Sequence, residues 1–148
     1  MKLARAAVAF ALLLPVAAGA QQAQVKVENA WARATPQGAE RGAVYMTLTA
    51  PKADRLVGAS SPSASRAEVH EMNMQGGVMR MREVPALMLP PGQAIVLRPG
   101  SYHIMLTGLT QPLRQGQSVV LRLAFANSPP VEVTAPVEGV GATGPARR

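Results

Sequence analysis

Apolar and polar residues alternate in short segments along most of the chain. The alternation is clearest over residues 44–49, 119–125 and 131–135, where apolar side chains occupy every second position. A period of two places every second side chain on one face of a β-strand, so these segments are expected to be half-buried strands. Clusters of Pro, Gly, Ser and Asn separate them and predict tight turns. Short strands at this spacing predict an all-β fold, a single-domain antiparallel β-sandwich or Greek-key barrel.

The two ends of the chain differ in composition from its middle. Residues 1–20 contain two basic residues, then an apolar run, then small residues up to Ala20, which is the pattern of a secretory signal peptide. The apolar run is shorter than the roughly 20 residues of a membrane-spanning helix, so no stable membrane insertion is expected. Residues 138–148 are Gly-rich without apolar periodicity and are expected to be disordered. We therefore predict cleavage after Ala20 and one folded domain over residues 21–137.

Charge and cysteine content exclude several classes of function. The formal net charge of +7 falls to +5 when the two basic residues of the leader are removed, and the remaining excess is scattered along the chain. Scattered single cations without interleaved aromatics do not indicate nucleic-acid binding. The chain has no cysteine, which excludes a thiol nucleophile, Cys-ligated zinc, a blue-copper thiolate and a lipid-modified cysteine.

Both histidines and most of the methionines fall in one window, residues 70–105. Methionine most often fills gaps in a core, so packing is the alternative reading for each sulfur. Residues 102, 104 and 106 form an apolar face, which leaves His103 and Met105 together on the opposite face of the same strand. The sequence Gln-Gly-Gly at 75–77 predicts a hairpin tip, which would bring the strand of His70 beside that of Met81. Over residues 79–82, methionine alternates with arginine, and this pattern suits methionines packed in a core as well as it suits methionines that bind a metal.

Two imidazoles with thioether sulfurs form a soft, uncharged set of donors. Such a set favours Cu(I), whereas zinc prefers thiolates or carboxylates beside histidine. Calcium and magnesium require clustered oxygens, and the chain has a single aspartate. Only the histidines would compete with protons, so Cu(I) affinity is expected to fall below a pH of about 6.5.

The spacing of these residues resembles that of the periplasmic copper chaperones of the PCuAC family, which are cupredoxin-like β-sandwiches. The family pattern is a histidine, ten residues, a methionine, twenty-one residues and then His-x-Met, and His70, Met81, His103 and Met105 match it without a gap. Similar segments run from AWAR at 30–33 to VVLRLAF at 119–125, almost the whole mature chain. The resemblance implies that these four residues bind one Cu(I) per chain in the periplasm.

The resemblance also implies a role and a partner. Family members pass Cu(I) to the copper centre of cytochrome c oxidase, directly or through a thiol-bearing assembly partner of the SCO type. Met72, Met74 and Met79 lie outside the pattern and are read either as accessory sulfurs or as packing. The tail has neither histidine nor methionine, so the second copper site that some relatives carry there is not expected. We expect the protein to act as a monomer.

Four other functions compete with delivery of copper. A copper buffer or resistance protein would bind the same ion but keep it, and the sequence does not separate storage from delivery. An electron-transfer cupredoxin would need the missing cysteine. An exported adhesion or assembly domain would bind no metal and would leave the four-residue spacing to chance. An enzyme would need a nucleophile with a base or a pair of carboxylates, and none stands out, so no catalytic activity is expected.

Overall fold

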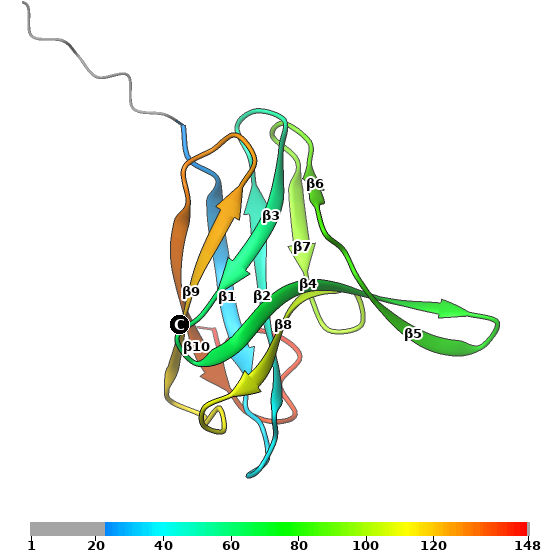
Figure 1. The fold of residues 1–148 in the computed structure, drawn as a ribbon, viewed down its shortest axis with the longest axis vertical. Helices are drawn as coiled ribbons and strands as arrows, with labels where there is room; N and C mark the ends of the chain where they lie inside the picture. Colours follow the sequence, from blue (N-terminus) through cyan, green and yellow to red (C-terminus); the bar gives the residue numbers. More distant parts are fainter. Residues whose placement is uncertain (1–22, 148) are drawn as a thin grey trace, which may run out of the picture.

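Seven strands close into a barrel in the computed structural model, which describes residues 23–147 (Figure 1). The strands pair in the order β4-β8-β2-β1-β10-β9-β3, and β3 pairs again with β4 to complete the ring. Three further strands extend it: β5 pairs with β4, β6 with β3, and β7 with β2. Their bounds are β1 Lys26–Arg33, β2 Arg41–Thr49, β3 Asp54–Ser60, β4 Ala64–Gln75, β5 Val78–Glu83, β6 Leu87–Leu89, β7 Ala94–Leu97, β8 Tyr102–Leu109, β9 Ser118–Phe125 and β10 Val131–Glu138.

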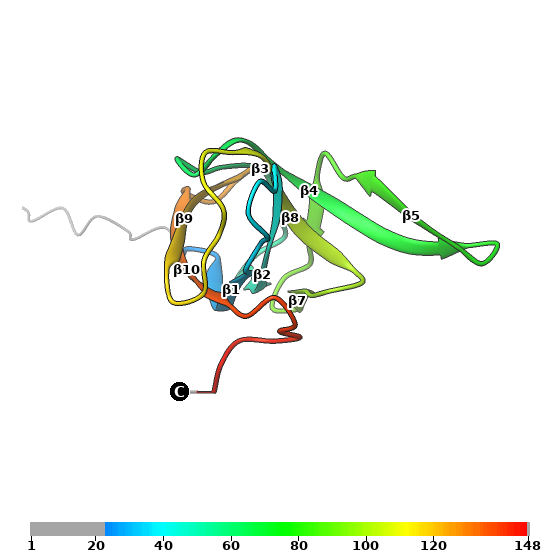
Figure 2. The ribbon, with the colours of Figure 1, turned by 90° about the horizontal axis from the view of Figure 1, so that it is seen from below.

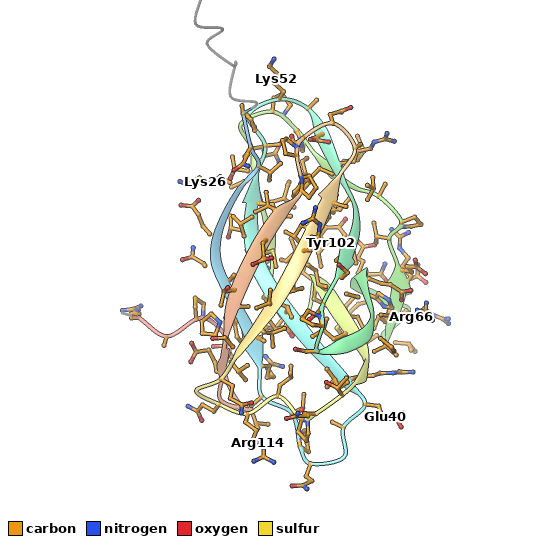
Figure 3. The ribbon with its side chains drawn as sticks, turned by 60° about the vertical axis from the view of Figure 1, so that its left-hand side comes forward. Lys26, Glu40, Lys52, Arg66, Tyr102 and Arg114 are labelled. Carbon is orange, nitrogen blue, oxygen red and sulfur yellow. The ribbon has the colours of Figure 1, made fainter. Side chains whose placement is uncertain are left out.

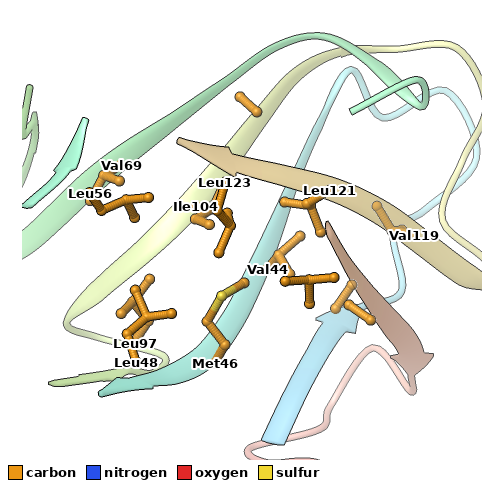
Figure 4. Close-up of a cluster of buried hydrophobic side chains, with 14 of the residues drawn as sticks. Val44, Met46, Leu48, Leu56, Val69, Leu97, Ile104, Val119, Leu121 and Leu123 are labelled. Atoms are coloured by element: carbon orange, nitrogen blue, oxygen red, sulfur yellow. The ribbon is translucent and has the colours of Figure 1, made fainter. Parts of the chain in front are cut away.

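The barrel interior is filled by the alternate apolar residues of these strands. On β2, Val44, Met46 and Leu48 are at most 1% exposed and point inward, where they meet residues of β8 and β9 (Figure 4). Met46 is therefore a core methionine, with its sulfur among aliphatic side chains. On β8 and β9 the period of two likewise places alternate apolar residues inside the barrel, as the sequence predicts.

The predicted all-β architecture is confirmed, because residues 23–147 contain strands and turns but no helix. Almost all of the paired strands are antiparallel, and the pairing of β1 with β10 is parallel. Within this described part of the chain, no helix is long and apolar enough to cross a membrane.

The predicted start of the domain at residue 21 lies outside the described residues, whereas its predicted end at residue 137 lies within them. The signal peptide and its cleavage site lie outside the described residues. At the other end, β10 extends to Glu138, one residue beyond the expected domain boundary. Disorder of residues 138–148 stays a prediction.

A two-stranded hairpin, β4–β5, projects from the side of the barrel (Figures 1 and 2). The first part of β4 pairs with β8 as far as Glu71, and the rest pairs with β5 alone. Gly76 and Gly77 both have positive φ angles, 57° and 76°, which a two-residue hairpin turn of the primed type requires. The hairpin tip expected from the sequence is therefore confirmed.

Charged side chains are spread over the surface of the barrel. The cations labelled in Figure 3 lie well apart, at both ends and on the sides of the molecule: Lys26, Lys52, Arg66 and Arg114. This arrangement agrees with the scattered charge pattern of the sequence.

Candidate metal centre

His70 and His103 lie directly opposite each other on the neighbouring strands β4 and β8. Their ring centroids are 6.0 Å apart, with the ring planes tilted by 42°. Opposite residues of an antiparallel pair share a face, and Val69 and Ile104 beside them occupy the face toward the core. The two imidazoles thus sit together on the outer face of the barrel wall, at the base of the hairpin.

Met81 and Met105 flank this pair on either side along the strands. Met105 is two residues from His103 on β8 and lies opposite Glu68, whereas Met81 lies opposite Met72 on the other side of β4. Strand parity places all of these side chains on the outer face that carries His70. The structure therefore brings the four residues singled out by the sequence onto one face of three adjacent strands, β5, β4 and β8.

Hydrogen bonding assigns the proton of the His103 ring. The Nδ1–H donates to the carbonyl oxygen of Ser101 at 3.2 Å, which leaves Nε2 with a free lone pair. The same carbonyl accepts the backbone N–H of Met72, so it joins the ring of His103 to the base of the hairpin. His103 is only 3% exposed, and this burial lowers the pKa of its imidazole below the ordinary value, with a smaller contribution from nearby His70. The ring is held in its neutral form, which is the form that ligates metals.

In the ring of His70, the roles of the two nitrogens are reversed relative to His103: within residues 23–147, Nε2 has the hydrogen-bond partner and Nδ1 is free. Its Nε2 lies 3.4 Å from a carboxylate oxygen of Glu68. The hydrogen bond from Arg66 lowers the pKa of Glu68, so this neighbour is an anion that accepts the Nε2 proton. Among the described residues, the buried Nδ1 of His70 has no hydrogen-bond partner. Buried polar atoms are seldom left unpaired, and a lone pair left free in this way suits a metal ion.

An aromatic layer lies beside the histidines on the outer face of the sheet. Tyr45 has its ring centroid 6.3 Å from that of His103 and 4.6 Å from that of Trp31. The guanidinium of Arg33 lies over both Trp31 and Tyr45, and it donates two hydrogen bonds to the carbonyl oxygen of Ala142. Trp31 and Tyr45 are 3% and 5% exposed, so they form a second, smaller buried layer outside the barrel core. This layer excludes water from one side of His103.

The sequence pattern does not predict this supporting layer or the hydrogen-bond partners of the two rings. Neither the alternating pattern nor the spacing of the candidate ligands points to Trp31, Glu68 or Ser101 as part of the site. A signal for Glu68 was present, because it shares a strand face with His70 two residues later. No local signal marks the Ser101 carbonyl, since its role depends on where β4 and β8 pair.

The hairpin methionines do not belong to the barrel core. All six residues of β5 are exposed, including Met79 at 55% and Met81 at 44%, and Met74 on β4 is 62% exposed. The core-packing reading of the alternating methionines is therefore wrong for Met79 and Met81. Within residues 23–147, no group of three or more His, Cys, Asp or Glu side chains is placed to hold a metal ion.

Comparisons with known proteins agree with this fold. The family model described as "LpqE-like: Putative lipoprotein LpqE-like" matches residues 25–137. The chain is 33% identical over 132 residues to "Putative lipoprotein Lxx21020" of Leifsonia xyli subsp. xyli (strain CTCB07), a match that covers 86% of this chain and 80% of that protein.

Two solved structures show the same architecture. The Cu(I) form of DR1885 from Deinococcus radiodurans superposes with a TM-score of 0.64 at 34% identity, covering 82% of this chain and 83% of that one. The copper-bound PCuAC domain from PmoF2 gives a TM-score of 0.67 at 26% identity, covering 80% and 95%. These likenesses confirm the cupredoxin-like PCuAC fold expected from the sequence.

Proposed function

Because this chain belongs to the LpqE-like family and has the fold of PCuAC domains, we propose that it binds one Cu(I) ion outside the cytoplasm and carries it to an acceptor protein. The observation that carries this proposal is the pair of imidazoles on the outer face, each with a ring nitrogen that its hydrogen bonding leaves free. The two solved structures compared above are described as copper-bound.

Four side chains are assigned as ligands in this proposal. His70 would bind through Nδ1 and His103 through Nε2, the two nitrogens that the surrounding acceptors leave without a proton. Met81 and Met105 would add thioether sulfurs from either side. The set is soft and uncharged, which favours Cu(I) over the divalent ions. Glu68 and the Ser101 carbonyl would orient the two rings, as outer-shell acceptors do at other metal sites.

The uneven burial of the ligands supports a carrier. His103 is nearly buried and packs beside Tyr45, so its ring is held in one position at the inner side of the site. Met81 is 44% exposed on a projecting hairpin, so an incoming ligand reaches this side first. We propose that an acceptor thiolate displaces Met81 and then the remaining ligands one at a time. The copper remains Cu(I) throughout, and the thioethers neither take up nor release a proton.

The compartment and the recipient are also part of the proposal. The leader-like residues 1–20 support export, and the related Leifsonia protein is described as a lipoprotein. We assign the protein to the periplasm, with cytochrome c oxidase or its SCO-type assembly partner as the recipient. This recipient follows from the family resemblance, and a soft, thiol-bearing acceptor suits the proposed exchange.

A competition titration with Cu(I) against a chromogenic chelator tests the binding site. The mature protein is expected to take up one equivalent, and His70→Ala and Met105→Ala are each expected to weaken that uptake. Met88→Ala is the matched control, because Met88 is 63% exposed on β6, which pairs with β3 and not with the hairpin. Uptake that neither ligand variant changes would overturn the proposed site.

A second experiment separates delivery from storage. The Cu(I)-loaded protein is mixed with a thiol-bearing acceptor domain of higher affinity, and the metal content of each is measured after separation. A carrier loses its copper to the acceptor within the time of mixing. A protein that binds Cu(I) at this site but retains it against the acceptor would be a buffer.

A further inference from the structure

Three methionines on the projecting hairpin are not used by the proposed Cu(I) site. Met74 lies directly opposite Met79, and Met72 lies opposite Met81. Residues opposite one another in an antiparallel pair share a face, as do residues two apart on one strand. One face of the hairpin therefore carries two cross-strand pairs outward from His70, first Met72 with Met81 and then Met74 with Met79.

The spacing allows the three outer sulfurs to meet. Opposite residues have Cβ atoms about 4.5–5.5 Å apart, and residues two apart on a strand are about 7 Å apart. Methionine has three rotatable side-chain bonds, so thioethers at these positions can turn toward a common point. Met72, Met74 and Met79 thus form a compact triangle on one surface.

Packing within the chain does not account for the two outermost of these side chains, Met74 and Met79. Beyond Glu71, strand β4 pairs only with β5, and the described part of the chain leaves Met74 62% and Met79 55% exposed. Exposed apolar side chains gain little from burial. The opposite face of the hairpin is instead polar, with Arg82 donating to Glu71 at 2.8 Å. The methionines are therefore segregated on one face, which is exposed at Met74 and Met79 and half-buried at Met72.

We propose that Met72, Met74 and Met79 form a second, thioether-only site for Cu(I), from which the ion passes to the histidine site. This inference rests on the proposed function for the identity of the cargo. Three thioethers are soft and neutral, so they suit Cu(I) or its non-redox analogue Ag(I). Without an imidazole, the outer site binds the ion more weakly than the inner one, as a site of first contact requires.

The transfer follows from the order of residues along β4. Met72 lies two residues from Met74 and two from His70, and it is opposite Met81. An ion held at the hairpin can exchange Met74 and Met79 for Met81 and His70 while Met72 remains bound. Each step replaces one neutral donor by another, so copper stays Cu(I) and no proton or electron is needed.

The test uses the mature protein with methionine methyl groups labelled with carbon-13, titrated with Ag(I) and monitored by NMR. The first equivalent is expected to shift the methyl signals of Met81 and Met105. A second equivalent is expected to shift those of Met72, Met74 and Met79. The signal of buried Met46 serves as an internal reference, since it lies in the core at 1% exposure.

A double variant, Met74→Leu with Met79→Leu, checks that these sulfurs make the outer site. Leucine conserves volume and apolar character but removes the sulfur, and both positions are exposed, so folding is expected to be unchanged. The variant should bind the first equivalent as the parent does and lose the second, whereas Met88→Leu should keep both.

The outcomes distinguish the two proposals. If the first equivalent binds normally but the second never moves the outer methyl signals, the outer site is refuted and the inner site stands. If the double variant retains the second equivalent, the outer site is likewise refuted. If the outer signals shift but those of Met81 and Met105 do not, the inner site and the proposed function fail while the thioether site remains.

Discussion

Replacing Met81 by leucine separates ligation from packing at the proposed Cu(I) site. Met81 is 44% exposed on β5, so its side chain contributes little to the core. Leucine has a similar volume, and exposed substitutions usually change the free energy of unfolding by no more than about 0.5 kcal/mol. The apo form of Met81→Leu is therefore expected to unfold at the same denaturant concentration as the parent.

The effect on copper is expected to be much larger. Changing only an outer-shell partner of a metal ligand typically costs about 10–100-fold in affinity. The loss of a direct thioether ligand should cost at least that, which corresponds to about 1.4–2.7 kcal/mol of binding free energy. The proposed site joins residues of three strands that only folding brings together, so the stabilisation by saturating Cu(I) should fall by up to the same amount.

The assay pairs Met81→Leu with Met88→Leu, since both remove a sulfur from an exposed strand position. Cu(I) competition against a chromogenic chelator gives the affinities, and urea unfolding with and without Cu(I) gives the stabilities. Only Met81→Leu should weaken copper binding. Equal affinity in Met81→Leu and the parent would refute a role for this sulfur, and equal weakening in both variants would show that the effect is not specific to the site.

Two further predictions concern the stability of the scaffold. Asp54 is 4% exposed, and its carboxylate accepts hydrogen bonds from the backbone N–H groups of Arg55, Asn127 and Ser128 at 2.7, 2.9 and 2.8 Å. Burial raises the pKa of this carboxyl, but the hydrogen bonds outweigh burial and lower the pKa below its ordinary value. The stabilisation by the Asp54 carboxylate is thus present above a pH of about 3.9 and is lost as pH falls through the lower folded-state pKa. Asp54→Asn should therefore lower the free energy of unfolding in urea by about 1.5–3 kcal/mol at pH 7 and by less at pH 2. An equal cost at both pH values would contradict this reasoning. Gly108 has φ of 67°, and a Cβ there would collide with the Ser65 hydroxyl, so thermal unfolding of Gly108→Ala should show a loss of about 1–3 kcal/mol or more.

Much of the site was accessible from the sequence because its relations are local. His103 and Met105 share a face for the simple reason that they are two residues apart on a strand. The hairpin that brings Met81 beside β4 follows from the two glycines at its tip, which adopt the positive φ angles expected of them. In the same way, alternation identified the inward residues of β2 and β9.

The environment of the ligands was not accessible in this way. The free nitrogens of the two rings depend on Glu68 and on the Ser101 carbonyl. The aromatic layer that backs His103 comes from Tyr45 and Trp31, which lie far earlier in the chain. The exposure of Met79 depends on the projection of β5 from the barrel (Figure 1). Local pattern had left that methionine equally suited to a core.

The sequence by itself determined several of the strands and their buried faces, the hairpin tip and the spacing of the four candidate ligands. Each of these depends on a backbone period or on a turn a few residues long, so it is encoded within a single segment. The tertiary structure alone decided that β4 and β8 pair with His70 opposite His103, and that β1 and β2 supply the aromatic layer. Strand pairing joins segments that are distant in the chain, and its register is set by the packing of the whole barrel rather than by any one strand.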